Sequence, residues 1–222
     1  MTKIFQALVI VAVCGVPALA TEINFQRSYR YNYLEFDSQD GNQSAREDAT
    51  HFDRFDSDLS RDFQAGESEA ASRATQTSEF SVTSILANGS TIGSYGPPVG
   101  SSNASGQSHF EVDFSIAEAV GYSLDLSASN SELGHVRLVG PSFSIDKQVG
   151  LAGGEPLSIS ENGIVQPGDY SLLINVSSSG AVDGIVGQYD LKFELVPEPC
   201  FSPFAILVMG LVWGRVSRRL RC

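Results

Sequence analysis

The amino-acid sequence predicts an all-β fold, an antiparallel β-sandwich with one apolar segment before it and another after it. Short runs of alternating apolar and polar residues recur at roughly ten-residue spacing from Phe80 to Leu195, which is typical of strands with one buried face. Segments rich in glycine, serine and proline separate these runs. The span 21–196 is long enough for one domain with its own core.

The first predicted strand covers Glu22–Phe36, in which aromatic and apolar residues alternate with polar ones. Its tyrosines, Tyr29, Tyr31 and Tyr33, fall on one face. Such a row serves either to stack on sugar rings or to pack against the core and neighbouring strands, the commoner use. We expect the polar residues 37–50 to form a loop.

Residues 51–79 fit two structures. Phe52, Phe55, Leu59 and Phe63 recur at steps of three and four, which is typical of an amphipathic helix. The small polar residues that follow are typical of long edge strands in secreted β-proteins. Helix and strand both remain open for this segment.

Most of the later strands are predicted from alternating apolar residues, as in His109–Ile116, Tyr122–Leu126 and Tyr189–Leu195. The Asn-Gly pairs at 88–89 and 162–163 predict tight turns. A Pro-Gly-x-Tyr turn at 167–170 leads into another strand. This turn is similar to those of jelly-roll, carbohydrate-binding-like modules, so we expect a jelly-roll-like sandwich.

Residues 197–222 contain three features in a fixed order. Pro197-Glu198-Pro199 comes first, and its prolines favour an extended linker. The uncharged run Cys200–Gly214 follows; as a helix it would cover about 22 Å, short of the roughly 30 Å hydrocarbon core. The chain then ends in a basic tail that we expect to stay in the cytoplasm. The arginines of this tail are Arg215, Arg218, Arg219 and Arg221.

This order resembles the PEP-CTERM sorting segment of Gram-negative, exopolysaccharide-producing bacteria. The resemblance implies a transmembrane sorting helix and an exosortase that cleaves near Pro197, Glu198 and Pro199. It also implies a protein that is anchored transiently in the inner membrane and then reaches the cell surface or the extracellular matrix. A plain tail anchor has a similar apolar run and basic end but needs no Pro-Glu-Pro, and a GPI signal lacks the terminal arginines.

Residues 1–20 have the three parts of a signal peptide. Lys3 supplies the positive charge and Ile4–Val16 the apolar run. Ala18 and Ala20 form the small-x-small cleavage pattern, so we expect the exported chain to begin at residue 21.

Composition restricts the chemistry of the span 21–196. The three cysteines, Cys14, Cys200 and Cys222, all lie outside it, which excludes a disulfide, a thiolate nucleophile and a cysteine-based metal site. Nine basic and 25 acidic residues remain in this span, a net charge of −16. That charge repels nucleic acid and is compatible with divalent cations, basic surfaces or neutral glycans.

No catalytic or metal-binding pattern stands out. His51, His109 and His135 are far apart in the sequence and lack partners at ligand spacing. Acidic pairs such as Glu111 and Asp113 are what strand alternation produces, although a glycosidase uses two carboxylates that the fold brings together. We therefore predict no catalytic residue, no metal site and no cofactor.

An acidic cluster within 51–79 invites a calcium interpretation. It lacks the loop glycine and the regular alternate ligands of an EF-hand, so we interpret it as a solvated acidic surface. Its members are Asp53, Asp56, Asp58 and Asp62.

Two classes of function follow. The first is a non-enzymatic, exported surface or matrix protein, sorted by an exosortase and associated with exopolysaccharide or biofilm. The second is a carbohydrate-binding module or weak glycan hydrolase on the same sandwich, for which a concave face with aromatic residues and paired acids is expected.

Overall fold

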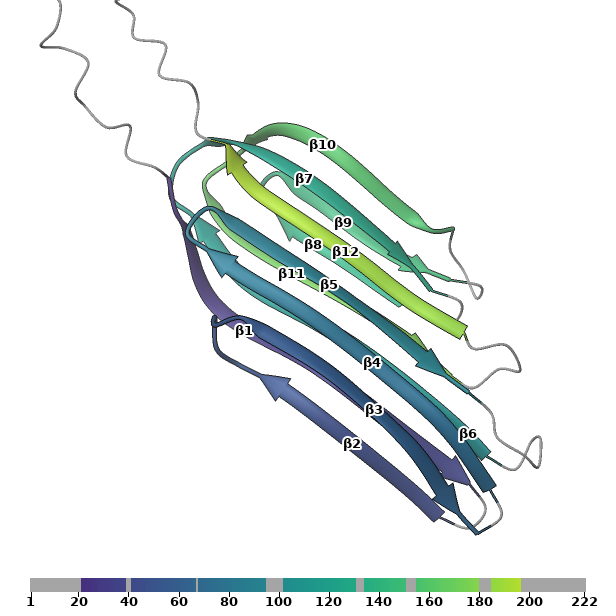
Figure 1. Cartoon of the computed structure of the whole chain (residues 1–222). Helices are drawn as coiled ribbons and strands as arrows, with labels where there is room; N and C mark the ends of the chain where they lie inside the picture. The colour runs from purple at the N-terminus through teal and green to yellow at the C-terminus, as the bar shows by residue number, and fades with distance from the viewer. Residues whose placement is uncertain are drawn as a thin grey trace, which may run out of the picture. The chain divides into compact units, whose positions relative to one another are not determined.

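The computed structural model describes residues 21–38, 41–66, 68–94, 102–130, 134–150, 155–179 and 185–196 (Figure 1). These residues form two six-stranded antiparallel sheets whose inner faces share a core, which confirms the predicted all-β sandwich. The predicted signal peptide and C-terminal sorting segment lie outside the described residues. Within the described ranges, no helix is long and apolar enough to cross a membrane.

Each strand is hydrogen-bonded to its neighbours in the order of its sheet. Sheet A consists of β2 (Gly41–Ala49), β1 (Ile23–Ser38), β6 (Ser102–Ile116), β11 (Gly168–Ser178), β8 (Gly134–Gly140) and β9 (Phe143–Val149). Sheet B consists of β10 (Leu157–Val165), β7 (Val120–Ser129), β12 (Ile185–Val196), β5 (Ser84–Gly93), β4 (Ser68–Ser81) and β3 (Phe55–Ala65).

The first and last strands meet at one end of the sandwich, where Figure 1 shows β1 beginning and β12 ending. Both are fixed there by the turn between β4 and β5. The amide of Ile23 donates to the carbonyl of Val82 at 2.7 Å, and the amide of Leu195 donates to the carbonyl of Thr83 at 2.8 Å. The chain therefore enters and leaves the domain at the same place.

Two apolar clusters fill the space between the sheets. The larger contains the alternating residues that the sequence pattern predicts to be buried, such as Phe110, Leu124 and Phe193. The smaller lies among the first strands and the start of β6, around Leu34 and Phe63. Burial of apolar side chains of this size stabilises a fold by about 1.5–3 kcal/mol each.

A layer of buried polar side chains separates the two clusters. In β1, Arg30 and Asn32 are fully buried and come between Ile23 of the larger cluster and Leu34 of the smaller. The Asn32 side-chain amide donates to the hydroxyl of Ser57 at 2.8 Å across the sandwich. Hydrogen bonds of this kind offset the cost of removing polar groups from water.

Arg30 is the one basic side chain in this layer. Its guanidinium donates to the carbonyl of Asp53 and to the hydroxyl of Ser78, both at 3.0 Å, and to the carbonyl of His51. It also lies 4.9 Å from the ring centre of Phe80, within the range of a cation–π contact. Burial lowers the pKa of Arg30 from its usual value to about 10.

The structure corrects the predicted loop at 37–50. β1 continues to Ser38, and β2 pairs with it from Arg30 opposite Ala49 to Ser38 opposite Gly41. Nearly all side chains of β2 are exposed. Because both faces of the edge strand β2 are in water, its sequence lacks the alternation of apolar residues from which a strand is predicted. Its polar residues also discourage pairing of the open edge with another chain.

From Phe55 onward, the segment 51–79 forms strands rather than a helix, and residues 51–54 lie between β2 and β3. Phe55, Leu59 and Phe63 lie in β3, and the small polar segment after them forms β4. A spacing of four residues is even, so it places side chains on one face of a strand as well as on one face of a helix. The periodicity therefore could not distinguish the two structures.

Both predicted Asn-Gly turns are wrong. Residues 88–89 lie in the middle of β5 and residues 162–163 lie within β10. Gly89 allows the backbone of β5 to pack closely against Ser108 and Tyr189, because a Cβ atom at this position would lie 2.5 Å from the Ser108 hydroxyl and from Cε1 of Tyr189. Glycine is required where two backbones or a backbone and a ring approach this closely.

Candidate functional site

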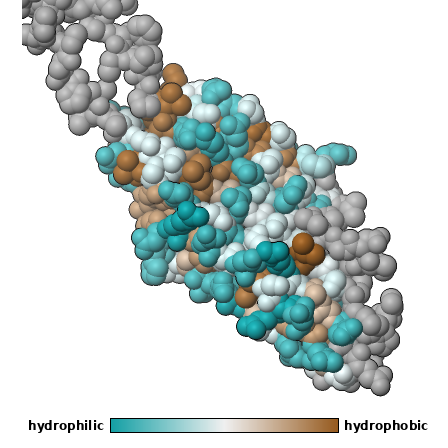
Figure 2. Space-filling view, in the orientation of Figure 1, coloured by the Kyte–Doolittle hydropathy of each residue, from teal (hydrophilic) through white to brown (hydrophobic). Residues whose placement is uncertain are grey.

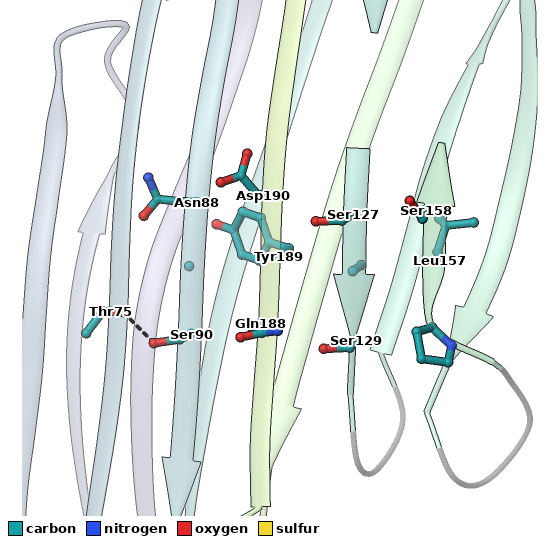
Figure 3. Close-up of a pocket in the computed structure, with 13 residues that line it drawn as sticks. Thr75, Asn88, Ser90, Ser127, Ser129, Leu157, Ser158, Gln188, Tyr189 and Asp190 are labelled. Carbon is teal, nitrogen blue, oxygen red and sulfur yellow. Dashed lines mark hydrogen bonds between the residues drawn. The ribbon is translucent and has the colours of Figure 1, made fainter. Parts of the chain in front are cut away.

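The outer face of sheet B is hollowed across five strands (Figure 3). The groove has a volume of about 540 Å³ and is lined by residues of β4, β5, β12, β7 and the start of β10. A groove of this size is within the range of small-molecule and oligomer binding sites. Seen from the same side, much of the surface is hydrophilic or neutral, and exposed apolar residues are more numerous toward the end where β1 begins (Figure 2).

Eight polar side chains line the groove in two rows that cross the strands. The first row is Thr75, Ser90, Gln188 and Ser129, and the second is Asn88, Asp190, Ser127 and Ser158. Successive members of a row are direct partners on neighbouring strands, which places them about 4.8 Å apart. Each position in the two rows therefore presents a hydroxyl, an amide or a carboxylate group, and neighbouring groups in a row are separated by the distance between adjacent strands.

Most of these groups are open to a ligand. The hydroxyls of Thr75 and Ser90 are hydrogen-bonded to each other at 2.7 Å. Within the described ranges, the exposed side chains of Asn88, Gln188 and Asp190 make no hydrogen bond or ion pair. Figure 3 shows them on adjacent strands β5 and β12, at the centre of the groove.

Small residues face inward beneath the groove. A Cβ atom on Gly89 would lie 2.5 Å from the hydroxyl of Ser108 in sheet A and from the ring of Tyr189, its direct partner in sheet B. A Cβ atom on Gly187 would lie 2.8 Å from Thr91 of the same sheet and from Asn130, which follows β7, and 3.1 Å from the carbonyl of Ser177 in sheet A. At both positions glycine therefore allows a close approach of neighbouring groups, including groups of the opposite sheet.

Asp190 is the one charged residue among those that line the groove. The next outward residue of β12, Lys192, pairs with Glu194 at 3.1 Å and lies beyond the two rows. On the neighbouring strand, Asp125 accepts a hydrogen bond from Ser160 at 2.6 Å. Counting the described residues alone, the groove therefore carries one negative charge and no cation of its own.

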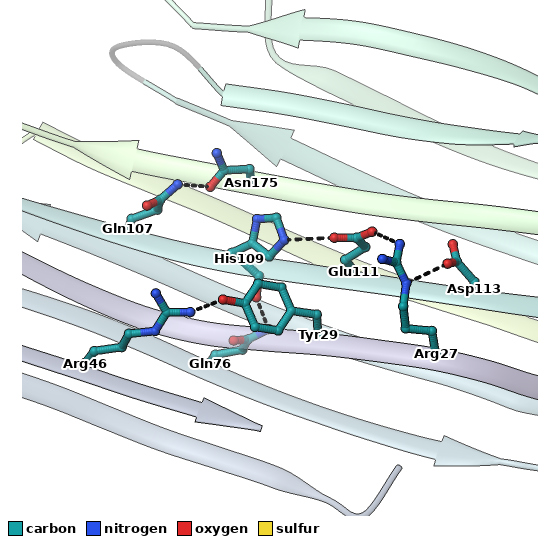
Figure 4. Close-up of polar contacts among 9 residues, drawn as sticks. All are labelled: Arg27, Tyr29, Arg46, Gln76, Gln107, His109, Glu111, Asp113 and Asn175. Carbon is teal, nitrogen blue, oxygen red and sulfur yellow. Dashed lines mark hydrogen bonds and ion pairs between the residues drawn. The ribbon is translucent and has the colours of Figure 1, made fainter. Parts of the chain in front are cut away.

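The tyrosine row lies on the outer face of sheet A, because its members alternate in β1 with the buried residues Arg30, Asn32 and Leu34. Figure 4 shows one member, Tyr29, beside Arg46 and His109. Tyr31 is stacked on His109 with ring centres 4.6 Å apart, and the Arg46 guanidinium lies 4.4 Å from the Tyr31 ring centre. Arg46 also donates to the hydroxyl of Tyr29, whose ring centre lies 5.3 Å from that of Tyr31. The rings thus pair across the strands, one of the two uses that the sequence left open.

A chain of charged groups continues from this cluster along β6. His109 Nε2 lies 3.4 Å from a carboxylate oxygen of Glu111, and Arg27 donates to Glu111 and, at 2.8 Å, to Asp113. The hydrogen bond to Asp113 raises the pKa of Arg27. Burial lowers the pKa of His109, while its hydrogen bond to Glu111 acts in the opposite direction.

The fold brings two of the three histidines into one row. Asn175 of β11 is the direct partner of both His109 and His135, so one strand separates the two imidazoles. His135 instead pairs with Asp146 at 2.8 Å, which lowers the pKa of that carboxyl. His51 lies in the connection between β2 and β3. No group of three or more metal-ligating side chains occurs in the ranges that the structure describes.

The acidic cluster on and before β3 is exposed at all four positions, as a solvated surface requires. Asp56 pairs with Arg54 at 3.2 Å, and Asp58 pairs with Arg73, whose hydrogen bond lowers the pKa of Asp58. These carboxylates are spread along a strand rather than gathered around a turn. They do not form the arrangement of ligands that calcium needs.

The residues predicted for sorting and processing fall outside the described part of the chain. They are Ala18, Ala20, Pro197, Glu198, Pro199, Arg215, Arg218, Arg219 and Arg221. The last described residue, Val196, ends β12 immediately before Pro197.

Sequence reasoning did not find the groove. The sequence does contain a pattern that points to the groove. The strands β5, β7 and β12 each carry two polar residues at outward positions two apart, as at Gln188 and Asp190. Such residues are common on solvated strand faces. Only the order and register of the strands show that they meet.

Together these features define an acidic, antiparallel β-sandwich protein with a polar groove on one sheet and a paired aromatic cluster on the other. Comparison of the chain with protein-family models, with curated proteins and with solved structures returns no match.

Proposed function

We propose that the protein is an exported, non-enzymatic cell-surface or extracellular-matrix protein that an exosortase sorts through residues 197–222. In this proposal residues 1–20 are the signal peptide, the apolar run after Pro199 spans the inner membrane before processing, and the sandwich associates with extracellular polysaccharide.

The feature that carries the proposal is the order of the sequence motifs in residues 197–222, with Pro197-Glu198-Pro199 first, then an uncharged apolar run, then a basic tail. On the domain side, β12 remains hydrogen-bonded up to Leu195. β1 starts beside the same turn, which leaves the other end of the sandwich unattached. Asp190 lies six residues before Val196, about 20 Å along the strand. A domain tethered in this way holds its groove well clear of its attachment point.

The strand order supports the jelly-roll-like fold that the sequence predicts. Of the eight strands from β5 to β12, four lie in sheet B in the order β5–β12–β7–β10, and four lie in sheet A in the order β6–β11–β8–β9. This is the order of two Greek keys in an eight-stranded jelly roll. The strands β1 to β4 then extend both sheets on one side.

The composition of the groove supports a binding role rather than hydrolysis. Glycoside hydrolysis ordinarily uses two carboxyl groups on either side of the scissile bond. Among the lining residues that the structure describes, Asp190 alone has a carboxylate.

Terminal peptide mapping of the protein from the native cell surface and medium tests the sorting proposal. We expect a chain that starts at residue 21 and ends between Val196 and Pro199. The variant Glu198→Gln should keep its C-terminal peptides and remain in the membrane, whereas Glu194→Gln, the same change within β12, should be processed normally. Surface protein whose peptides reach Cys222 would contradict the proposal and indicate a plain membrane anchor.

A carbohydrate-binding module is the second candidate, favoured by the eight hydrogen-bonding side chains in the groove. It differs from the first in requiring specific recognition of a glycan. A rise in melting temperature with one polysaccharide, and with no other of a broad panel, would favour it.

A further inference from the structure

We propose that a neutral polysaccharide chain binds in the groove of sheet B and lies across the strands, along the two rows of polar side chains. This inference rests on the proposed function, because the ligand is the extracellular polysaccharide of that proposal. It adds the site, the class of polysaccharide and the direction of the bound chain.

The side chains of the groove match the hydrogen-bonding chemistry of sugars. A sugar hydroxyl both donates and accepts, as do the serine hydroxyls and the amides of Asn88 and Gln188. Asp190 only accepts, so its two oxygens are suited to a pair of neighbouring sugar hydroxyls. These three side chains make no other hydrogen bond within the described ranges, and binding would therefore break no existing contact.

The length of the rows favours a chain rather than a single sugar. The groove extends over five strands, from Thr75 of β4 to Ser158 of β10, which corresponds to about 19 Å across the sheet. Several successive sugar rings fit in that length. Each ring would face the side chains of one or two strands, so affinity should rise with the number of sugars until the groove is filled.

The residues beyond the rows set the direction of the bound chain. On one side, Leu86 and Lys192 are direct partners and replace the small polar residues. On the other side, Ile92 is 40% exposed and lies opposite Arg73. Because the small polar residues end at these positions, the groove continues across the strands rather than along them.

Charge selects neutral over acidic polysaccharides. The described residues that line the groove include Asp190 and no lysine or arginine, and the span 21–196 carries a net charge of −16. The carboxylates of an acidic polysaccharide would be repelled by this negative charge and would find no cation among these residues to pair with. Both the association rate and the affinity would therefore be reduced.

The test uses the full-length chain purified in a non-glycosidic detergent, so that the detergent offers no sugar. Binding is measured by affinity electrophoresis against mixed-linkage β-glucan, xyloglucan, galactomannan and dextran, with alginate and polygalacturonate as the acidic probes. Calorimetry with oligosaccharides of increasing length then measures the size of the site. We expect binding to at least one neutral polysaccharide and none to the acidic ones.

Matched variants locate the site. Removing the side chains of Asn88, Gln188 and Asp190 by substitution with alanine should weaken binding about fivefold each and about 100-fold together. These side chains are exposed, so the melting temperature should not change. The control is the double variant Gln107→Ala and Asn175→Ala on the outer face of sheet A, where the two side chains hydrogen-bond to each other at 2.9 Å; it should bind normally.

Three results would overturn the inference. Unchanged binding by the triple groove variant, with loss in the sheet A control, would put the site on the other sheet while leaving polysaccharide association in place. Binding to alginate or polygalacturonate alone would refute the argument from charge. Binding to no polysaccharide would remove both the groove site and the polysaccharide part of the proposed function, whereas the sorting part depends separately on the terminal peptides.

Discussion

Replacement of Gly89 by alanine tests the close contact beneath the groove. The new Cβ atom would lie 2.5 Å from the Ser108 hydroxyl oxygen and from Cε1 of Tyr189, and 2.8 Å from Cζ of that ring. Carbon atoms in good contact are about 3.5–4.0 Å apart, so the ring or the strand must move by about 1 Å. Tyr189 is only 3% exposed, which leaves it little room to do so.

The expected loss of stability follows from two opposing effects. Inserting a methyl group into a well-packed interior costs about 1–3 kcal/mol. Replacing glycine by alanine also reduces the conformational entropy of the unfolded chain, which raises the free energy of unfolding by about 0.4–1 kcal/mol. We therefore expect Gly89→Ala to lower the free energy of unfolding by about 1–2 kcal/mol. For a domain of this size, that corresponds to a fall in melting temperature of roughly 2–8 °C.

Gly163→Ala is the matched control, because Gly163 also follows an asparagine and also lies within a strand. Its Cβ atom would come no closer than 3.0 Å to the Tyr122 ring, at the edge strand β10. Chemical denaturation of both variants should show a clearly smaller loss for Gly163→Ala. Equal stabilities for Gly89→Ala and the unmodified protein would refute the argument that glycine is present here to bring the sheets together.

Two further predictions concern buried ionisable groups. Burial lowers the pKa of His109, so its contribution to stability is present above about pH 6.5 and is lost as the pH falls through its folded-state pKa. Replacing His109 by glutamine should make the acid-induced loss of stability shallower; a profile unchanged by this substitution would show that His109 is not responsible. Arg30→Ala should destabilise by about 3 kcal/mol because it leaves a cavity beside Phe80, and Arg30→Met should cost less than half as much because it fills that space. If urea unfolding gives the same loss for both variants, the hydrogen bonds of Arg30 matter more than its packing.

Strand alternation could be predicted where one face of a strand is buried. Phe110, Val112 and Phe114 alternate with polar residues, and all three are buried as expected. The same reasoning failed for β2, because an edge strand exposed on both faces needs no alternation. It also failed at Gly89, where the contact that requires glycine is made with residues distant in the sequence.

The groove depends still more on distant partners. Asn88, Ser127 and Asp190 are about 40 to 100 residues apart in the sequence, and the strand order brings them together. Each residue by itself has the ordinary character of a solvated strand. Their common row follows from the register of β12 with β5 on one side and β7 on the other, and local sequence carries little information about register.

The central place of β12 also has a mechanical consequence. Its residues pair with β5 from Ile185 to Glu194 and with β7 from Gln188 to Val196. If the chain is held beyond Val196 while a ligand bound across the groove pulls on the neighbouring strands β5 and β7, the hydrogen bonds of both ladders are loaded together in shear. An edge strand such as β10, held on one side alone, would have half as many bonds to share the same load. An attachment beyond Val196 would therefore load a strand that is hydrogen-bonded on both sides.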